Sequence, residues 1–307
     1  MSKKTAVLLA GFGGPETPAE VRPFIQSVAL GAHIPPERLE IVAGHYEKIG
    51  GRSRYNEITV KQRAALEALF KKKNLPIEVS VGFLHSHPSF TQVFSEMKKN
   101  SVERALVFVL SAFRSYPSFE RYHERLEDAR RAAGAETMEL QYSAPFHDHP
   151  LFIGAVSDRI AEIIKNIPAE ELSKTHFLFT AHSIPVDWAE NSDYDEEFNE
   201  SAALAAKKMK LGSWDIVYQS RSGPPNYPWL EPDINDAIRG LPRGKWKRVA
   251  LVPIGFLSDN AEVLYDLDIK AQKTAAECGL RYSRALTVMD HPSFIEMIAS
   301  LIAQRSG

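Results

Sequence analysis

"LVPIGFLSDNAEVLYDLDI" (Leu251 to Ile269) begins as an apolar strand and ends as a helix that carries Glu262 and Asp266. A short apolar run that leads through a loop into a helix is typical of an α/β protein. Beyond Gly255, apolar residues would stabilise a core better than carboxylates do. The acids after this strand therefore indicate a chemical role.

Similar short apolar runs recur along the chain, separated by segments with helical periodicity such as "EITVKQRAALEALFKKK". Near-continuous apolar strands are buried on both faces, as in parallel sheets. The alternation predicts a doubly wound α/β fold. The expected strands cover residues 5–13, 77–85, 104–113, 137–143, 176–183, 215–222, 248–256 and 280–287.

A repeated motif divides these strands into two sets of four. "DHPLFIGAVSDRIAEII" starts at Asp148 and "DHPSFIEMIASLIAQ" at Asp290, each after a fourth strand. We expect both aspartates to cap a helix that starts at proline, which makes His149 and His291 helix-start residues rather than metal ligands. The repeat predicts two similar doubly wound lobes, each a four-stranded parallel sheet flanked by helices, over residues 1–150 and 151–307.

The composition of the 307 residues is that of an ordinary globular protein, with a net charge of -2 that gives no support to a nucleic-acid partner. The single cysteine, Cys278, excludes an internal disulfide and fits a reducing compartment. No apolar run approaches the roughly 18 residues that a membrane span needs. We expect a cytoplasmic protein, and attachment to a membrane surface stays open.

The carboxyl ends of the strands are expected to carry the function, because ligands of open α/β sheets bind there. "AHSIP" brings His182 to one strand end and "GFLSDNAE" brings Glu262 after another strand of the same lobe. An imidazole titrates near neutral pH and binds metals, and a carboxylate accepts protons. The pair suits proton removal coupled to metal handling, with Asp266 on the same helix face as Glu262. A solvated helix face is the competing interpretation.

Other site motifs are missing. "GFGGPE" at Gly11 to Glu16 departs from the Gly-x-Gly-x-x-Gly fingerprint, and the chain has no P-loop, no Gly-x-Ser-x-Gly and no His-Glu-x-x-His. His85 and His87 alternate along an expected strand, so at most one of them faces a given site. Nucleotide binding and a two-histidine metal site are both weakly supported.

Several segments together resemble the ferrochelatases, which insert ferrous iron into a porphyrin to make haem. "LAGFGGPETPAEV" is similar to the family's opening strand and loop, and "HYEKIGGRSRYNEIT" resembles its Y-x-x-I-G-G-x-S-P-L segment. "TAHSIP" resembles S-A-H-S-L-P, and "YQSRSGPPNYPWLEPD" resembles Y-Q-S-x-x-G-x-x-P-W-L-x-P. "VPIGFLSDNAEVLYDLDI" is similar to P-x-G-F-x-S-D-H-x-E-x-L-Y-E-L-D. The five segments follow one another in the family's order over nearly the whole chain.

The resemblance implies an iron chelatase, a lyase of the last step of haem biosynthesis, acting on protoporphyrin IX or coproporphyrin III. It implies that porphyrin lies between the lobes, that His182 and Glu262 form the catalytic and metal-contacting pair, and that Asp266 lies on a proton or metal route. Fe²⁺ is then a substrate, and no permanently bound cofactor is expected. One cysteine cannot hold an iron–sulfur cluster.

The sequence departs from the family pattern at three positions that bear on the chemistry or on porphyrin binding. Asn260 stands where the family often has histidine, and Lys270 stands where a third acid is common. Phe12 occupies a position where some members have tyrosine or methionine. A phenyl ring cannot ligate iron, so we expect Phe12 to pack against the macrocycle.

Candidate substrate-binding residues follow from the chemistry of a porphyrin. Its propionates need cationic partners, for which the candidates are Arg52, Arg54 and Arg114. Its apolar faces need aromatic walls, for which the candidates are Phe12, Tyr116 and Trp229. Tyr46, Ile49 and "FIQSVAL" at residues 24–30 form a candidate apolar lip for a membrane or a porphyrin-delivering enzyme.

Other functions stay open at this point. The first is a chelatase for another metal or tetrapyrrole. The second is a non-catalytic porphyrin or haem carrier on the same fold, which Asn260 and Lys270 favour and the pair of His182 and Glu262 disfavours. The third is a two-lobed sugar or amino-acid binding protein.

Overall fold

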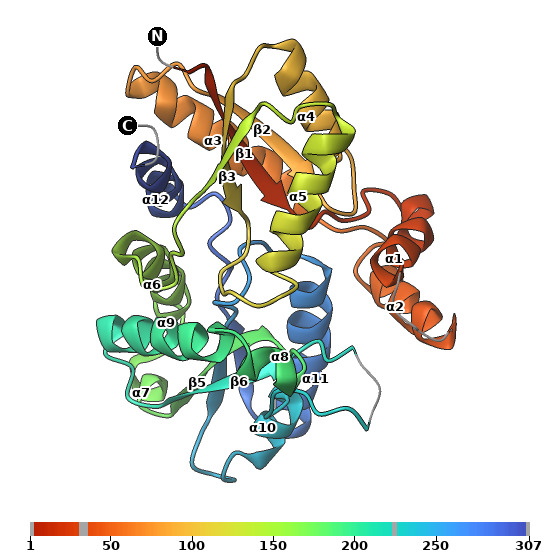
Figure 1. Cartoon of the computed structure of the whole chain (residues 1–307). Coiled ribbons are helices and arrows are strands. Elements are labelled where there is room, and N and C mark those ends of the chain that lie inside the picture. The colour runs from red at the N-terminus through yellow and green to blue at the C-terminus, as the bar shows by residue number, and fades with distance from the viewer. Residues whose placement is uncertain (1–2, 31–35, 223–225, 305–307) are drawn as a thin grey trace. The chain divides into compact units, whose positions relative to one another are not determined.

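The computed structural model describes residues 3–30, 36–222 and 226–304, which form two parallel four-stranded sheets with helices around them (Figure 1). All eight expected strands are confirmed. They are β1 (Thr5–Gly11), β2 (Glu78–Phe83), β3 (Arg104–Val109), β4 (Glu139–Tyr142), β5 (Thr175–His182), β6 (Trp214–Gln219), β7 (Arg248–Val252) and β8 (Arg281–Arg284).

Helices connect the strands in both halves of the chain. The first half contains η1 (Pro18–Glu20), α1 (Val21–Ala29), α2 (Pro36–Lys48), α3 (Tyr55–Lys72), α4 (Phe90–Lys99) and α5 (Glu120–Ala132). The second contains α6 (Pro150–Ile164), α7 (Ala169–Leu172), α8 (Val186–Glu190), α9 (Tyr194–Met209), α10 (Ile234–Gly240), the π-helix η2 (Val263–Ala271), α11 (Gln272–Glu277) and α12 (Pro292–Ala303).

The two sheets have the same topology, β2-β1-β3-β4 and β6-β5-β7-β8. The strand order reverses between β1 and β3 in the first sheet and between β5 and β7 in the second. In open α/β sheets the carboxyl ends of such strands are where ligands bind. In the second sheet this point lies where His182 ends β5 and where the segment toward Glu262 leaves β7.

Helices cover both faces of each sheet, so the doubly wound prediction is confirmed. In the first sheet Leu8 packs on α4 and α5, whereas Phe108, on the opposite face, contacts Phe294 of α12. In the second, Leu178 packs with residues of α10, η2 and α11, and Tyr218, on the opposite face, contacts Phe198 of α9. Burial on both faces explains the continuous apolar character of the central strands.

The chain divides into two compact units, and these differ from the expected lobes at the C-terminal end. Unit 1 covers Met1–Ser111, Tyr116–Pro145 and Met289–Gly307, and unit 2 covers Ala112–Ser115 and Phe146–Val288. Helix α12, the last helix of the expected range 151–307, therefore belongs to unit 1. The Phe294 ring lies 6.4 Å from the ring of Phe108, and Glu296 forms an ion pair with Lys73 of the segment after α3.

The helices of the repeated motif are capped by histidine rather than by aspartate. The Nδ1 atom of His149 accepts a hydrogen bond from the Leu151 N–H of α6, and His291 accepts one from the Ser293 N–H of α12. Proline occupies the first helical position in both, so the residue directly before it is the cap. The expectation that Asp148 and Asp290 are the caps was wrong by one residue.

Candidate active site at His182 and Glu262

His182 is the last residue of β5, and its ring is held in one orientation. Its Nδ1 atom lies within hydrogen-bond distance of the Ser183 carbonyl oxygen. A carbonyl only accepts, so Nδ1 carries the proton and Nε2 is free for other chemistry. The Tyr194 hydroxyl donates to the His182 carbonyl at 2.8 Å, which holds the backbone. Nε2 lies 3.6 Å from Oε1 of Glu262.

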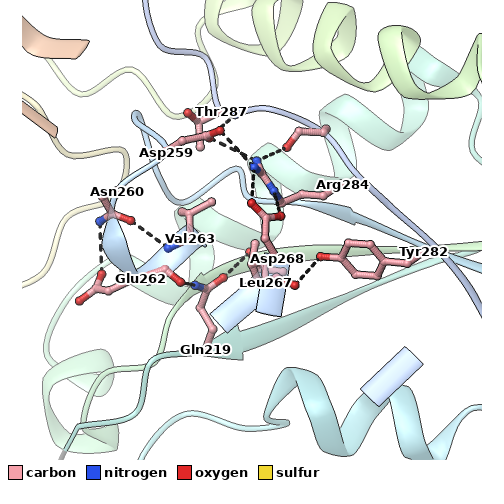
Figure 2. A network of polar contacts seen from close by, with 12 residues as sticks. Gln219, Asp259, Asn260, Glu262, Val263, Leu267, Asp268, Tyr282, Arg284 and Thr287 are labelled. Atoms are coloured by element: carbon pink, nitrogen blue, oxygen red, sulfur yellow. Dashed lines mark hydrogen bonds and ion pairs between the residues drawn. The ribbon is translucent and has the colours of Figure 1, made fainter. Parts of the chain in front are cut away.

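Glu262 lies at the start of the π-helix η2, where Asn260 orients it (Figure 2). The Asn260 Oδ1 atom accepts a hydrogen bond from the Val263 N–H, at the start of η2, at 3.0 Å. Its Nδ2 donates to Glu262 Oε2 at 3.4 Å. The neutral Asn260 side chain thus binds both the backbone of η2 and the Glu262 carboxylate.

Gln219, the last residue of β6, connects β5 to the backbone of Glu262. It accepts a hydrogen bond from the Thr180 hydroxyl at 2.9 Å and donates to the Glu262 carbonyl at 3.4 Å. Gln219 is 1% exposed, so its amide is committed to these contacts. Sequence reasoning did not single out Gln219 or Tyr194. The position of Gln219 at the end of an apolar strand was the available signal.

His182 and Glu262 each stabilise the charged form of the other. Burial alone would lower the pKa of His182, but the Glu262 carboxylate, the Ser183 carbonyl and Asp266 together raise it above its usual value. Burial alone would raise the pKa of Glu262, but His182 and the Asn260 amide hold it below its usual range. The pair therefore exists as an imidazolium and a carboxylate over a wider pH range than the free side chains would.

Asp266 lies one turn beyond Glu262 and is held from two sides. The Ser220 hydroxyl donates to its Oδ2 at 2.6 Å, and the Lys270 ammonium lies 3.3 Å from its Oδ1. The expected helix is present, but it is a π-helix, a rare form found often at functional sites. Asp266 is 7% exposed. Lys270 thus neutralises the carboxylate that follows Glu262 instead of extending a line of acids.

The aromatic candidates lie in the segments that follow strands β1, β3 and β6 of their own units. In unit 1, Phe12 follows β1, is 36% exposed, and packs against His85 with ring centroids 4.8 Å apart. Tyr116 is 45% exposed and donates to Glu124 at 3.2 Å. In unit 2, Trp229 forms a bridge with Pro185, and its buried Nε1 has no hydrogen-bond partner among the described residues. The exposed faces of Phe12 and Tyr116 are compatible with a flat apolar ligand.

The arginine candidates differ in how far they are already engaged. Arg52 is exposed, and Arg54 lies 3.7 Å from Glu57 on the surface of unit 1. Arg114 lies in ion pairs with Asp193, at 2.6 Å, and with Glu197, a side chain that is 3% exposed. Two carboxylates compete with any propionate for Arg114, so Arg52 and Arg54 are the more available cations.

His85 and His87 do not form a metal site together. Burial, with smaller effects from Arg121 and Arg125, lowers the pKa of His85 to about 4, and its Nδ1 lies 3.2 Å from the Ser27 hydroxyl. His87 is held instead by Gln92 at 3.0 Å, beside the capping box of α4. Their separate partners agree with the expectation that the two side chains diverge.

The proposed apolar lip is only partly exposed. Tyr46 is buried, and its ring lies 6.3 Å from that of Phe24. Leu30, at the end of α1, is 80% exposed. Of the expected lip residues, Leu30 rather than Tyr46 is thus available to a surface. No helix in the described part of the chain combines the length and hydrophobicity needed to cross a membrane.

Comparisons with known proteins agree with the order of motifs in the sequence. The family model described as Ferrochelatase matches residues 4–306. A ferrochelatase of Rhodopirellula baltica is 38% identical over 98% of this chain and 86% of its own length. A coproporphyrin III ferrochelatase of Mycolicibacterium smegmatis is 38% identical over 97% and 88%, and one of Nocardia farcinica is 37% identical over 97% and 87%.

Solved structures share the fold at low identity. The sirohydrochlorin chelatase SirB of Bacillus subtilis subspecies spizizenii, in complex with cobalt, matches with a TM-score of 0.61 and 14% identity over 99% of this chain and 95% of that chain. SirB of Bacillus subtilis with Fe³⁺ matches with a TM-score of 0.65 and 14% identity over 99% and 96%. With the family model covering nearly every residue, these findings show that the chain belongs to the ferrochelatase family.

Proposed function

We propose that this protein is a ferrochelatase, a lyase that inserts ferrous iron into a porphyrin with loss of both central N–H protons. The observation that carries the proposal is the 3.6 Å approach of His182 Nε2 to Glu262 Oε1 at the carboxyl ends of β5 and β7. Membership of the ferrochelatase family supports the same reaction.

The pair has the proton capacity that metal insertion needs. Above the pKa of His182, the neutral imidazole and the ionised Glu262 carboxylate together accept two protons, which matches the number that a porphyrin releases. A flat macrocycle holds its nitrogen lone pairs in the ring plane, so binding energy that bends the ring exposes them to an incoming ion. His182 and Glu262 are the proposed metal-contacting and proton-accepting groups, and Asp266 carries protons onward from Glu262.

Coproporphyrin III is the proposed porphyrin, which two of the three relatives named above support. It carries propionates where protoporphyrin IX carries vinyl groups, so it needs more cationic partners. Arg52 and Arg54 are the proposed partners in unit 1, and Arg114 is a third candidate. Phe12, Tyr116 and Trp229 are the proposed apolar contacts. The proposal requires no resident cofactor or iron–sulfur cluster.

An anaerobic absorbance assay tests the function directly. Purified protein is mixed with ferrous iron and either coproporphyrin III or protoporphyrin IX, and the porphyrin bands are followed over many equivalents. Turnover with coproporphyrin III in preference to protoporphyrin IX is expected. Binding that stops at one porphyrin per protein would identify a carrier, and turnover only with cobalt or zinc would identify a chelatase for another metal.

We also propose a peripheral attachment in which α1 meets a membrane surface or a porphyrin-delivering enzyme through Leu30, since this side chain is 80% exposed. Co-sedimentation of the native chain and of Leu30→Ser with phospholipid vesicles tests whether the partner is a membrane surface. Equal sedimentation of the two proteins would reject membrane attachment through Leu30.

A further inference from the structure

Arg284, the last residue of β8, is a buried cation that the chemistry above does not use. Its side chain is 8% exposed, although burying a guanidinium is costly unless carboxylates surround it. Burial alone would lower the pKa of Arg284, but hydrogen bonds and charge from Asp268 and Asp259 raise it above its usual value. The residue is thus a permanent positive charge inside unit 2.

The guanidinium binds two carboxylates at once (Figure 2). Nε and Nη2 donate to the two oxygens of Asp268 at 2.6 and 2.8 Å. Nη1 and Nη2 donate to the two oxygens of Asp259 at 3.3 and 3.1 Å. Both pairs are bidentate, which fixes orientation as well as distance. Arg284 therefore determines how Asp259 and Asp268 sit relative to each other.

Asp259 and Asp268 lie on either side of Glu262 in the sequence. Asp259 is 2% exposed and also accepts from the Thr287 N–H at 3.1 Å, which ties the loop to the segment after β8. Asp268 lies in the π-helix η2, whose Leu267 carbonyl accepts from the Tyr282 hydroxyl at 2.7 Å. Strand β8 thus holds both ends of the segment that carries the candidate catalytic carboxylate.

A short path of contacts leads from the guanidinium to Glu262. Asp259, fixed by Arg284, is followed directly by Asn260. The Asn260 side chain accepts from the Val263 N–H and donates to Glu262 Oε2 at 3.4 Å. A shift of Asp259 therefore moves the side chain that orients Glu262. A shift of Asp268 alters the helix to which Glu262 belongs.

We propose that Arg284 is a positioning residue that, by clamping Asp259 and Asp268, holds the Glu262 carboxylate opposite His182. This inference rests on the proposed function, because it assigns a role in the reaction of that site. Buried ion clusters contribute little net stability compared with apolar packing, and fixing one conformation is the role that this proposal assigns to the cluster around Arg284. The uncommon π-helix is one such conformation.

The other end of the same sheet offers a matched control. Arg248 at the start of β7 is 11% exposed and pairs with the buried Glu171 at 3.2 Å, and Arg281 at the start of β8 pairs with the same carboxylate. This cluster resembles that of Arg284 in burial and charge but lies at the amino ends of the strands. Arg248→Met therefore disrupts a buried ion cluster without touching the segment around Glu262.

The experiment compares iron insertion by the full-length wild type, Arg284→Met, Asp268→Asn and Arg248→Met. We expect Arg284→Met to lower kcat by about 10- to 100-fold, because a displacement on the order of 1 Å has such an effect, with the porphyrin KM nearly unchanged. The Asp268 side chain is 34% exposed, so Asp268→Asn keeps the protein folded. It should lower kcat by a smaller factor than Arg284→Met does. Arg248→Met should lower thermal stability and leave kcat per folded molecule within about twofold.

A double-variant comparison shows whether Arg284 acts through Glu262. If it does, adding Arg284→Met to Glu262→Gln should lower kcat much less than it does in the wild type, because residues acting as a unit are not additive. Unchanged kcat in both Arg284→Met and Asp268→Asn would overturn the positioning role, as would equal losses in Arg284→Met and Arg248→Met. If the wild type turns over under these conditions, such a result refutes only the positioning role of Arg284. If the wild type does not turn over, the proposed function and the positioning role are refuted together.

Discussion

Gly255 lies against Ala181 so closely that a Cβ at position 255 would be 2.6 Å from the Ala181 Cβ and 2.7 Å from its Cα. The Gly255 N–H also donates to the Thr180 carbonyl at 3.0 Å. The end of β5 and the loop after β7 therefore touch through backbone just before His182. Only a residue without a side chain permits this approach.

Gly255→Ala should disturb both the fold and the site. The added methyl has to displace the backbone of β5, which costs about 1–3 kcal/mol of unfolding free energy, and the displacement reaches His182. Denaturant unfolding and iron insertion measure the two effects. Gly240→Ala is the control, since a Cβ there meets nothing within 4 Å. Equal stability and activity of both variants would show that the loop adapts without moving His182.

His182→Ala should lower the rate of iron insertion by about 10²- to 10⁴-fold, the contribution typical of a positioned acid or base. Porphyrin binding, followed by fluorescence quenching, should persist because the aromatic candidates are untouched. His87→Ala provides the matched control, since His87 contacts Gln92 at 3.0 Å rather than the site. Wild-type turnover by His182→Ala would exclude this imidazole from the reaction.

Glu262→Gln should lower the pKa of His182. In the wild type the carboxylate helps to raise this pKa above the usual value of about 6.5, so removing the charge brings the titration to lower pH. NMR titration of the imidazole in the wild type and in Glu262→Gln measures the shift. A His182 titration that does not move would contradict the coupling between the two side chains.

The same coupling sets a pH window for stability. The raised pKa of His182 contributes stability that is present below about pH 6.5 and is lost as pH rises through the folded-state pKa. The lowered pKa of Glu262 contributes stability that is present above about pH 4.3 and is lost as pH falls through its folded-state pKa. The stability difference between wild type and Glu262→Gln should therefore be largest between about pH 4.3 and 6.5 in denaturant titrations.

Arg114→Met should lower the stability of the protein, whereas Arg52→Gln should weaken porphyrin binding. Removing the Arg114 guanidinium takes the arginine partner away from the buried Glu197, which costs about 1–3 kcal/mol of unfolding free energy. Arg52 is exposed, so Arg52→Gln should leave stability unchanged and raise the KM for the porphyrin. Thermal unfolding and steady-state kinetics separate these outcomes. An unchanged KM in Arg52→Gln would remove it from the propionate contacts.

The strands were predictable because their burial is a local property of the sequence. Leu8 and Phe108 are apolar because helices cover both sheet faces, and that pattern appears in any short window of the chain. The placement of α12 was not predictable in this way, because its motif repeats that of α6. Its assignment to unit 1 depends on contacts such as Phe294 with Phe108, far apart in sequence.

The site was partly predictable for a similar reason. His182 and Glu262 each follow a strand of one sheet, so the rule for strand ends brings them together without knowledge of side chains. The π-helix was not predictable, because the spacing of Val263, Asp266 and Ile269 also fits an α-helix. The roles of Arg284 and Asn260 depend on hydrogen bonds between segments, which no pattern along the sequence reveals.

The assignment of α12 to unit 1 also bears on how the chain acquires its structure during translation. The ribosome completes every segment of unit 2 before it reaches Met289, whereas unit 1 still lacks α12 at that moment. Domains generally fold as units during synthesis. The nascent unit 1 therefore cannot complete its core until α12 emerges, because Phe108 lacks its Phe294 partner until then.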